Sequence, residues 1–106
     1  MLMFAGPKRT FEDFKRQLNP HVLPAFEELR SFCLSLANTV EDVRAHRIVF
    51  GKSLTFRWFV DMEPGANSII IKIQRDRKEP FKTITVMLDS LDEIKSQIRE
   101  AHQNIR

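Results

Sequence analysis

The strongest constraint on the fold is a regular alternation of apolar side chains between residues 54 and 88. Three runs carry them at every second position: Leu54, Phe56, Trp58, Val60 and Met62; Ile69, Ile71 and Ile73; and Ile84, Val86 and Leu88. Successive side chains of a strand point to opposite faces of its sheet, so this period indicates strands with one buried face. The other face is polar and basic with few apolar members: Thr55, Arg57, Phe59, Ile70, Lys72, Gln74, Thr83 and Thr85.

Short connections between these runs predict hairpins. We expect strands at 43–50, 54–62, 68–75 and 81–88, with the first at an edge because its alternation is poor. The connection at 51–53 is tight, and Pro64-Gly65 suits a type II turn. Such lengths are too short for parallel crossovers, so the simplest topology is a four-stranded antiparallel meander.

Two helices are predicted before the strands. Thr10 is a helix cap followed by acids in the first turn, and Asn19-Pro20 ends this helix over 11–18. A second helix begins near Pro24 and stops near Asn38, and 39–42 form one further turn. Its broad apolar stripe suits packing on a sheet: Ala25, Phe26, Leu29, Phe32, Cys33 and Leu36.

A third helix is predicted at the C-terminal end of the sequence. Ser90 and Glu93 have the spacing of a capping box, and apolar residues then repeat at three and four positions through Ile105. The order predicts a single α+β domain over 1–106. In it, two N-terminal helices and one C-terminal helix pack on one face of the meander.

Composition fits an ordinary globular domain of 106 residues, with 42% hydrophobic and 29% charged side chains. No apolar run approaches the roughly 20 residues that span a bilayer. The first seven residues form a very short apolar stretch, and basic Lys8 and Arg9 follow it, the reverse of a secretory signal. We therefore expect a poorly ordered N-terminus in a cytoplasmic protein, and a lone Cys33 fits a reducing compartment.

The net charge of +3 is unevenly distributed. Residues 44–82 hold nine basic and four acidic side chains, a net charge of +5, whereas the segments on either side are each −1. The basic excess therefore lies in the strand region, which points to the sheet as the surface to test.

No catalytic, metal or cofactor motif is present. Four acid pairs lie near predicted helix or turn starts, where acids complement free N–H groups: Glu12/Asp13, Glu27/Glu28, Glu41/Asp42 and Asp92/Glu93. The three histidines, His21, His46 and His102, fall in separate elements without metal-ligand spacing. The three glycines form no phosphate-binding loop. We predict a protein that is not an enzyme and holds no metal or cofactor.

The polar face of the sheet is the remaining candidate. Aromatic rings stack on bases while Arg and Lys contact phosphates, so this face is a candidate for binding single-stranded nucleic acid. The candidate residues are Arg44, Arg47, Arg57, Phe59, Lys72, Gln74, Arg75, Arg77 and Lys78. The alternative is a solvated face whose charges prevent aggregation. Trp58 and Phe56 are assigned to the core side.

The same face offers a second interpretation. Phe59, Ile70 and Met87 share its side and define a candidate apolar patch for a homodimer or a protein partner. Alternatively, the first helix covers this patch and leaves no functional surface.

The segments Phe26-Glu27-Glu28-Leu29-Arg30, Leu91-Asp92-Glu93-Ile94 and Ile98-Arg99-Glu100-Ala101 frame the strands. With that element order, residues 24–104 resemble a small uncharacterised α+β domain of unknown function in prokaryotic proteins. The resemblance implies no activity and no site residues, and it favours a standalone accessory or binding module.

These observations predict a non-enzymatic binding or protein-interaction module. The alternative is a nucleic-acid-binding protein that uses the basic outer face of the sheet, and the third is an enzyme whose site is assembled only in the fold. Self-association and a protein partner both fit the first prediction, and none of the three involves a membrane.

Overall fold

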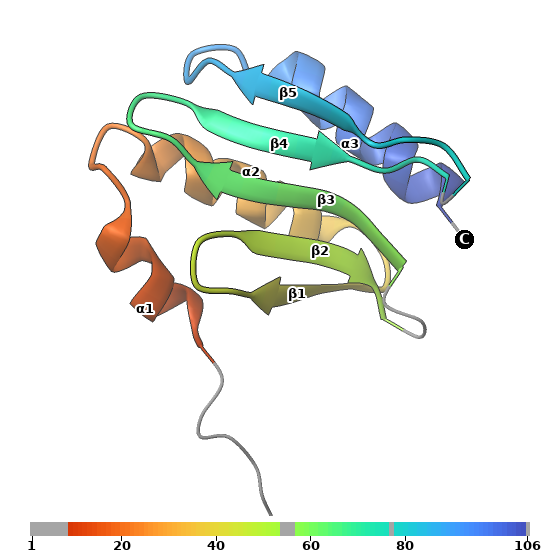
Figure 1. Cartoon of the computed structure of the whole chain (residues 1–106), viewed down its shortest axis with the longest axis horizontal. Coiled ribbons are helices and arrows are strands. Elements are labelled where there is room, and N and C mark those ends of the chain that lie inside the picture. The colour runs from red at the N-terminus through yellow and green to blue at the C-terminus, as the bar shows by residue number, and fades with distance from the viewer. Residues whose placement is uncertain (1–8, 54–56, 77, 106) are drawn as a thin grey trace, which may run out of the picture.

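The computed structural model describes residues 9–53, 57–76 and 78–105, which form an antiparallel sheet with helices on one face (Figure 1). Within these residues the sheet has five strands in the order β1-β2-β3-β4-β5. The elements are α1 (Phe11–Phe14), the 3-10 turn η1 (Lys15–Gln17), α2 (Leu23–Ser35), β1 (Thr39–Val43), β2 (Ile48–Lys52), β3 (Arg57–Pro64), β4 (Ile69–Ile73), β5 (Lys82–Val86) and α3 (Asp92–Asn104).

The predicted α+β class and the antiparallel meander are confirmed, but four strands is wrong. The expected turn at 39–42 lies in the strand β1, and the expected strand 43–50 contains the turn 44–47 and the first three residues of β2. Arg44 donates its backbone N–H to the Arg47 carbonyl at 2.9 Å to close that hairpin. Sequence alternation missed β1 because an edge strand is half-exposed on both faces, and Glu41 and Asp42 resemble the acids of a helix start.

The first two helices start where predicted but end early. Thr10 caps α1, its Oγ1 accepting from the Asp13 N–H at 3.1 Å, and α1 gives way to η1 after Phe14. Pro24 lies in the first turn of α2. This helix ends at Ser35, before Asn38, which has a φ of 58° and leads the chain into β1.

The predicted capping box at Ser90 is wrong. Leu91 is the residue that precedes α3, and no side chain caps this helix. Leu91 is buried in the core, so packing of its side chain positions the start of the helix, and Asp92 and Glu93 supply the favourable charge there.

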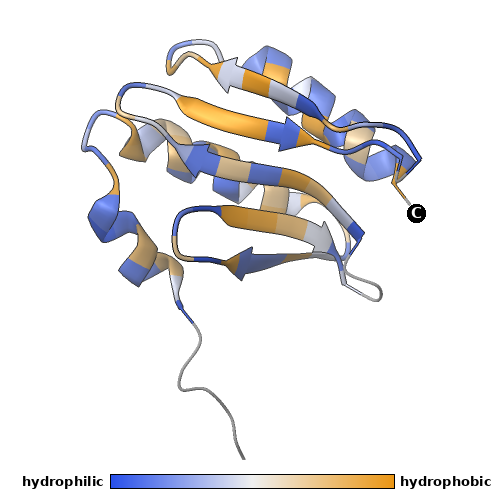
Figure 2. Cartoon of the chain, viewed as in Figure 1, coloured by the Kyte–Doolittle hydropathy of each residue, from blue (hydrophilic) through white to orange (hydrophobic). Residues whose placement is uncertain are grey.

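The core lies between the sheet and the pair α2 and α3, which share one face of it (Figure 1). Colouring by hydropathy shows long apolar stretches in β2 and β4, whereas β3 between them has both apolar and hydrophilic bands (Figure 2). The alternation predicted this correctly for Ile69, Ile71 and Ile73 of β4, which are all buried in the core.

The opposite side of the sheet, here called the outer face, carries no helix in the described part of the chain (Figure 1). The first helix does not cover it. Phe11 and Phe14 of α1 pack on the Phe26 ring of α2, with centroids 6.4 and 5.6 Å away. Gln17 donates to the Ala45 carbonyl at 2.8 Å, which holds this segment beside the β1–β2 turn. Among the described residues, every helix is too short or too polar to cross a membrane.

Candidate functional site: the outer face of the sheet

A β-bulge in β3 decides which aromatic side chains reach the outer face. Phe50 of β2 lies opposite Val60, but the next residue, Gly51, lies opposite Trp58. Phe59 is therefore the extra residue of the bulge, and the side-chain alternation reverses on passing it. Both Phe59 and Val60 are buried on the helix side.

The predicted placement of Phe59 on the outer face is therefore wrong. Phe59 is 0% exposed, and its ring meets His102 of α3 edge-on at 5.2 Å. Trp58 takes the outward position that the sequence pattern gave to Phe59, and the core position assigned to Trp58 is wrong as well. Leu54, Thr55 and Phe56 lie outside the described residues.

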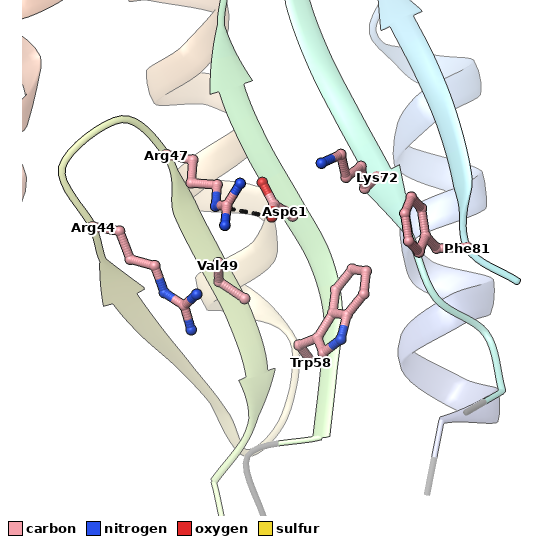
Figure 3. Close-up of a pocket in the computed structure, with 7 residues that line it drawn as sticks. All are labelled: Arg44, Arg47, Val49, Trp58, Asp61, Lys72 and Phe81. Atoms are coloured by element: carbon pink, nitrogen blue, oxygen red, sulfur yellow. Dashed lines mark ion pairs between the residues drawn. The ribbon is translucent and has the colours of Figure 1, made fainter. Parts of the chain in front are cut away.

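Trp58 belongs to a shallow hollow of about 280 Å³ on the outer face (Figure 3). We call it the outer-face hollow, and it is lined by Arg44, Arg47, Val49, Trp58, Asp61, Lys72 and Phe81. Its floor follows from strand register, because Val49 of β2, Asp61 of β3 and Lys72 of β4 lie directly opposite one another. A hollow of this kind admits one side chain or one small ring.

Aromatic side chains form one wall of the hollow. The Trp58 and Phe81 rings are tilted by 60° with centroids 6.0 Å apart, and the Lys72 ammonium lies 5.6 Å from the Phe81 centroid. Phe81, just before β5, is 49% exposed. The wall therefore offers ring surface together with a cation that already interacts with an aromatic face.

Arg44 and Arg47 form the opposite wall, and each is paired with a carboxylate. Arg47 Nε lies 3.4 Å from Asp61 Oδ2, and Arg44 Nε lies 2.9 Å from Asp42 Oδ2. Asp61 is only 8% exposed. Burial raises the pKa of the Asp61 carboxyl, and the charges of Arg47 and Lys72 lower it part of the way back.

Nine residues were predicted to bind nucleic acid, and the eight of them that the structure describes are not brought together. Arg44, Arg47 and Lys72 line the hollow. Gln74 is buried and donates to backbone carbonyls of the 76–79 loop, while Arg75 pairs with Glu79 and with Glu100 of α3.

The remaining members of that set lie elsewhere. Arg57 is half-buried beyond the bulge, opposite Lys52, and Lys78 is exposed in the loop after β4. Arg77 lies outside the described residues. Of the predicted apolar patch, Ile70 lies opposite Thr85 on the outer face and Met87 is exposed, whereas Phe59 is in the core.

Trp58 and Phe81 are the site residues that the sequence analysis missed. Gly51 carries the signal for Trp58, because a glycine inside a strand marks a bulge, but it was assigned to a turn. Phe81 shares alternate positions with Thr83 and Thr85, which indicates the outer face.

Charge on the outer face is balanced. Arg44, Arg47 and Lys72 face three acids on the same side of the sheet: Asp42, Asp61 and Glu63. The basic excess of residues 44–82 is therefore spread around the molecule instead of gathering at the hollow, and the local positive potential is small.

Among the described residues, no group of three His, Cys, Asp or Glu side chains is placed to hold a metal ion. Burial raises the pKa of the Cys33 thiol, which disfavours the nucleophilic thiolate. The His102 ring lies 2.7 Å from the Ala37 carbonyl, where it links α3 to the residues after α2.

The chain matches no protein-family model, and comparisons with curated proteins and with solved structures find no similar protein. The resemblance to a prokaryotic α+β domain thus stays a prediction.

Proposed function

We propose that this chain is a non-enzymatic protein-binding module that uses the outer-face hollow as the centre of its contact. Its partner is a protein segment that inserts an apolar side chain beside Trp58 and Phe81 and offers a carboxylate to Lys72. The observation that carries the proposal is the Trp58–Phe81 pair on a sheet face without a helix over it in the described residues.

Residue composition supports a protein as the partner. Protein interfaces are enriched in Trp, Phe, Met and Arg, and their strongest contacts are aromatic and Arg side chains that leave water on binding. The hollow offers Trp58, Phe81, Arg44 and Arg47, and the exposed Met87 follows β5. Its paired arginines suit a polar rim, since both already have carboxylate partners.

Single-stranded nucleic acid is the second candidate. It is favoured by one observation, the position of the Lys72 ammonium beside the aromatic wall, where a base would stack with its phosphate nearby. Charge argues against it, because three acids balance the cations of the same face.

Selection from a displayed library of random peptides tests the first proposal. We expect selected peptides to share an aromatic or large aliphatic residue near an acidic one. Their affinity should fall at least tenfold with Phe81→Ala, because this substitution removes the exposed ring of the wall. Ile70→Ala, an apolar truncation on the same face but outside the hollow, is the matched control and should leave binding unchanged.

The sole tryptophan, Trp58, provides the readout. Binding in the hollow should shift its fluorescence. Peptides that bind with equal affinity to the wild type and to Phe81→Ala, or that leave Trp58 emission unchanged, would contradict the proposal.

A further inference from the structure

The two free edges of the sheet differ in how well they are protected against further pairing. β1 and β5 are the edge strands. Unpaired backbone N–H and C=O groups along an edge are open to another strand unless charges, prolines or bulges block it. β1 carries Glu41 and Asp42, and both are ion-paired with arginines.

β5 lacks that protection. Its sequence is Lys-Thr-Ile-Thr-Val, with one charge at its first residue, no proline and no register shift against β4. It forms the outermost strand of the sheet, beyond β4 (Figure 1). Lys82, Thr83 and Thr85 are exposed.

Exposed apolar side chains flank β5 symmetrically. Phe81 precedes the strand and is 49% exposed, and Met87 follows it and is 62% exposed. Each is three residues from Ile84, the centre of the strand. Both occupy the side-chain positions that alternate with Ile84, so they belong to the outer face together with Thr83 and Thr85.

We propose that the chain forms a homodimer in which β5 pairs antiparallel with β5 of a second copy, around a two-fold axis at Ile84. This register is the one that pairs the strand over its whole length, and it places Phe81 of each copy opposite Met87 of the other. It also sets Thr83 opposite Thr85. Aromatic–thioether contacts and Thr–Thr pairs across strands are both favourable.

Self-pairing explains why Phe81 and Met87, the two most exposed large apolar side chains of the described residues, both flank this edge. A two-fold interface is self-complementary, and a strand with an aromatic residue at one end and methionine at the other meets that requirement when it runs antiparallel to itself. The two sheets then join into one, with the helices of both copies on the same side.

The dimer also changes the binding site. Because Phe81 is part of the wall of the outer-face hollow, Met87 of the second copy lies at its rim and enlarges the apolar surface beside Trp58. The inference does not rest on the proposed function, since edge pairing holds whether or not the hollow binds a protein.

Analytical ultracentrifugation of the full chain over a range of concentrations tests the interface. We expect the mass to rise from 12.5 kDa toward twice that value as concentration increases. Thr83→Lys with Thr85→Lys places lysines opposite lysines across the axis and should weaken the dimer at least tenfold. Both positions are exposed, so the monomer should keep its fold, which circular dichroism checks.

A charge-swapped variant makes the test specific for the register. Thr83→Glu with Thr85→Lys places unlike charges opposite each other only when the axis lies at Ile84, so its dimer should be at least tenfold stronger than that of the double-lysine variant. A wild-type chain that stays monomeric at every concentration would overturn the proposal. Two further results would overturn it. One is a double-lysine variant that dimerises as strongly as the wild type, and the other is a charge-swapped variant whose dimer is no stronger than that of the double-lysine variant.

Discussion

Asp61 is a carboxylate on the outer face, and its burial there removes part of its hydration. It lies between Val49 and Lys72 on the floor of the hollow, with one arginine at 3.4 Å as its ion-pair partner. A pKa raised by burial means that the folded chain holds the proton more tightly than the unfolded chain does. Ionisation of Asp61 therefore opposes folding.

The sign of this effect gives a pH prediction. The contribution of Asp61 to the free energy of unfolding is most favourable at pH values below the pKa that its carboxyl has in the unfolded chain. It is lost as the pH rises through the higher pKa of the folded chain. We expect Asp61→Asn to raise the free energy of unfolding at pH 7 by less than about 1 kcal/mol, since the lost attraction to Arg47 and Lys72 offsets part of the gain.

Urea denaturation of the wild type and Asp61→Asn from pH 3 to pH 7 measures the difference. The stability gain should grow with pH over this range. Asp42→Asn, which changes a half-exposed carboxylate paired with Arg44, is the matched control. A gain that shrinks toward pH 7 would show that the Arg47 contact outweighs the cost of burial.

At the scale of the element, the bulge in β3 determines which aromatic side chain lies on the outer face. One extra residue opposite the β2 strand turns Phe59 toward α3 and Trp58 toward solvent. Gly51 lies across from Trp58, and a glycine inside a strand is typical of a bulge. The aromatic wall of the hollow therefore depends on a local irregularity of two strands.

Alanine substitutions at the two aromatic positions test this assignment. Phe59→Ala should cost about 3–5 kcal/mol of unfolding free energy, because it leaves a cavity in the core. Trp58→Ala should cost less than half as much, since Trp58 is half-buried on the outer face. Equal losses of unfolding free energy, or a larger loss for Trp58→Ala, would contradict the assignment of Phe59 to the core and Trp58 to the outer face.

At the scale of the whole molecule, the sheet separates two surfaces of different character. Helices α2 and α3 cover one face and enclose the core, and the other face keeps an aromatic pair within a balanced set of charges. The net charge of +3 is therefore a poor guide to what the outer face attracts.

Charge balance predicts weak salt dependence for nucleic acid. A labelled single-stranded oligonucleotide that binds the outer face should release few counterions, so its affinity should change less than about tenfold between 50 and 200 mM salt. Lys72→Ala should flatten that dependence further, and Lys78→Ala in the exposed loop is the control. A steep salt dependence whose slope Lys72→Ala lowers by about one, while Lys78→Ala leaves it unchanged, would favour the nucleic-acid candidate over the protein partner.

Local patterns in the sequence determined much of the fold. Alternation over Ile69–Ile73, the Thr10 cap and Pro24 in the first turn of α2 each act through near neighbours, and the structure has all three as predicted. Strands joined by short turns also specified the meander.

Tertiary structure decided the fifth strand and the identity of the exposed ring. β1 is held at the edge by pairing with β2 and by the Arg30–Glu41 ion pair with α2, and its own sequence gives little apolar alternation. Trp58 and Phe59 are both large and aromatic, and only the bulge against β2 distinguishes them. A period of two holds only while the register of both strands is unbroken, so the sequence alone indicated the candidate face but assigned the wrong aromatic residue to it.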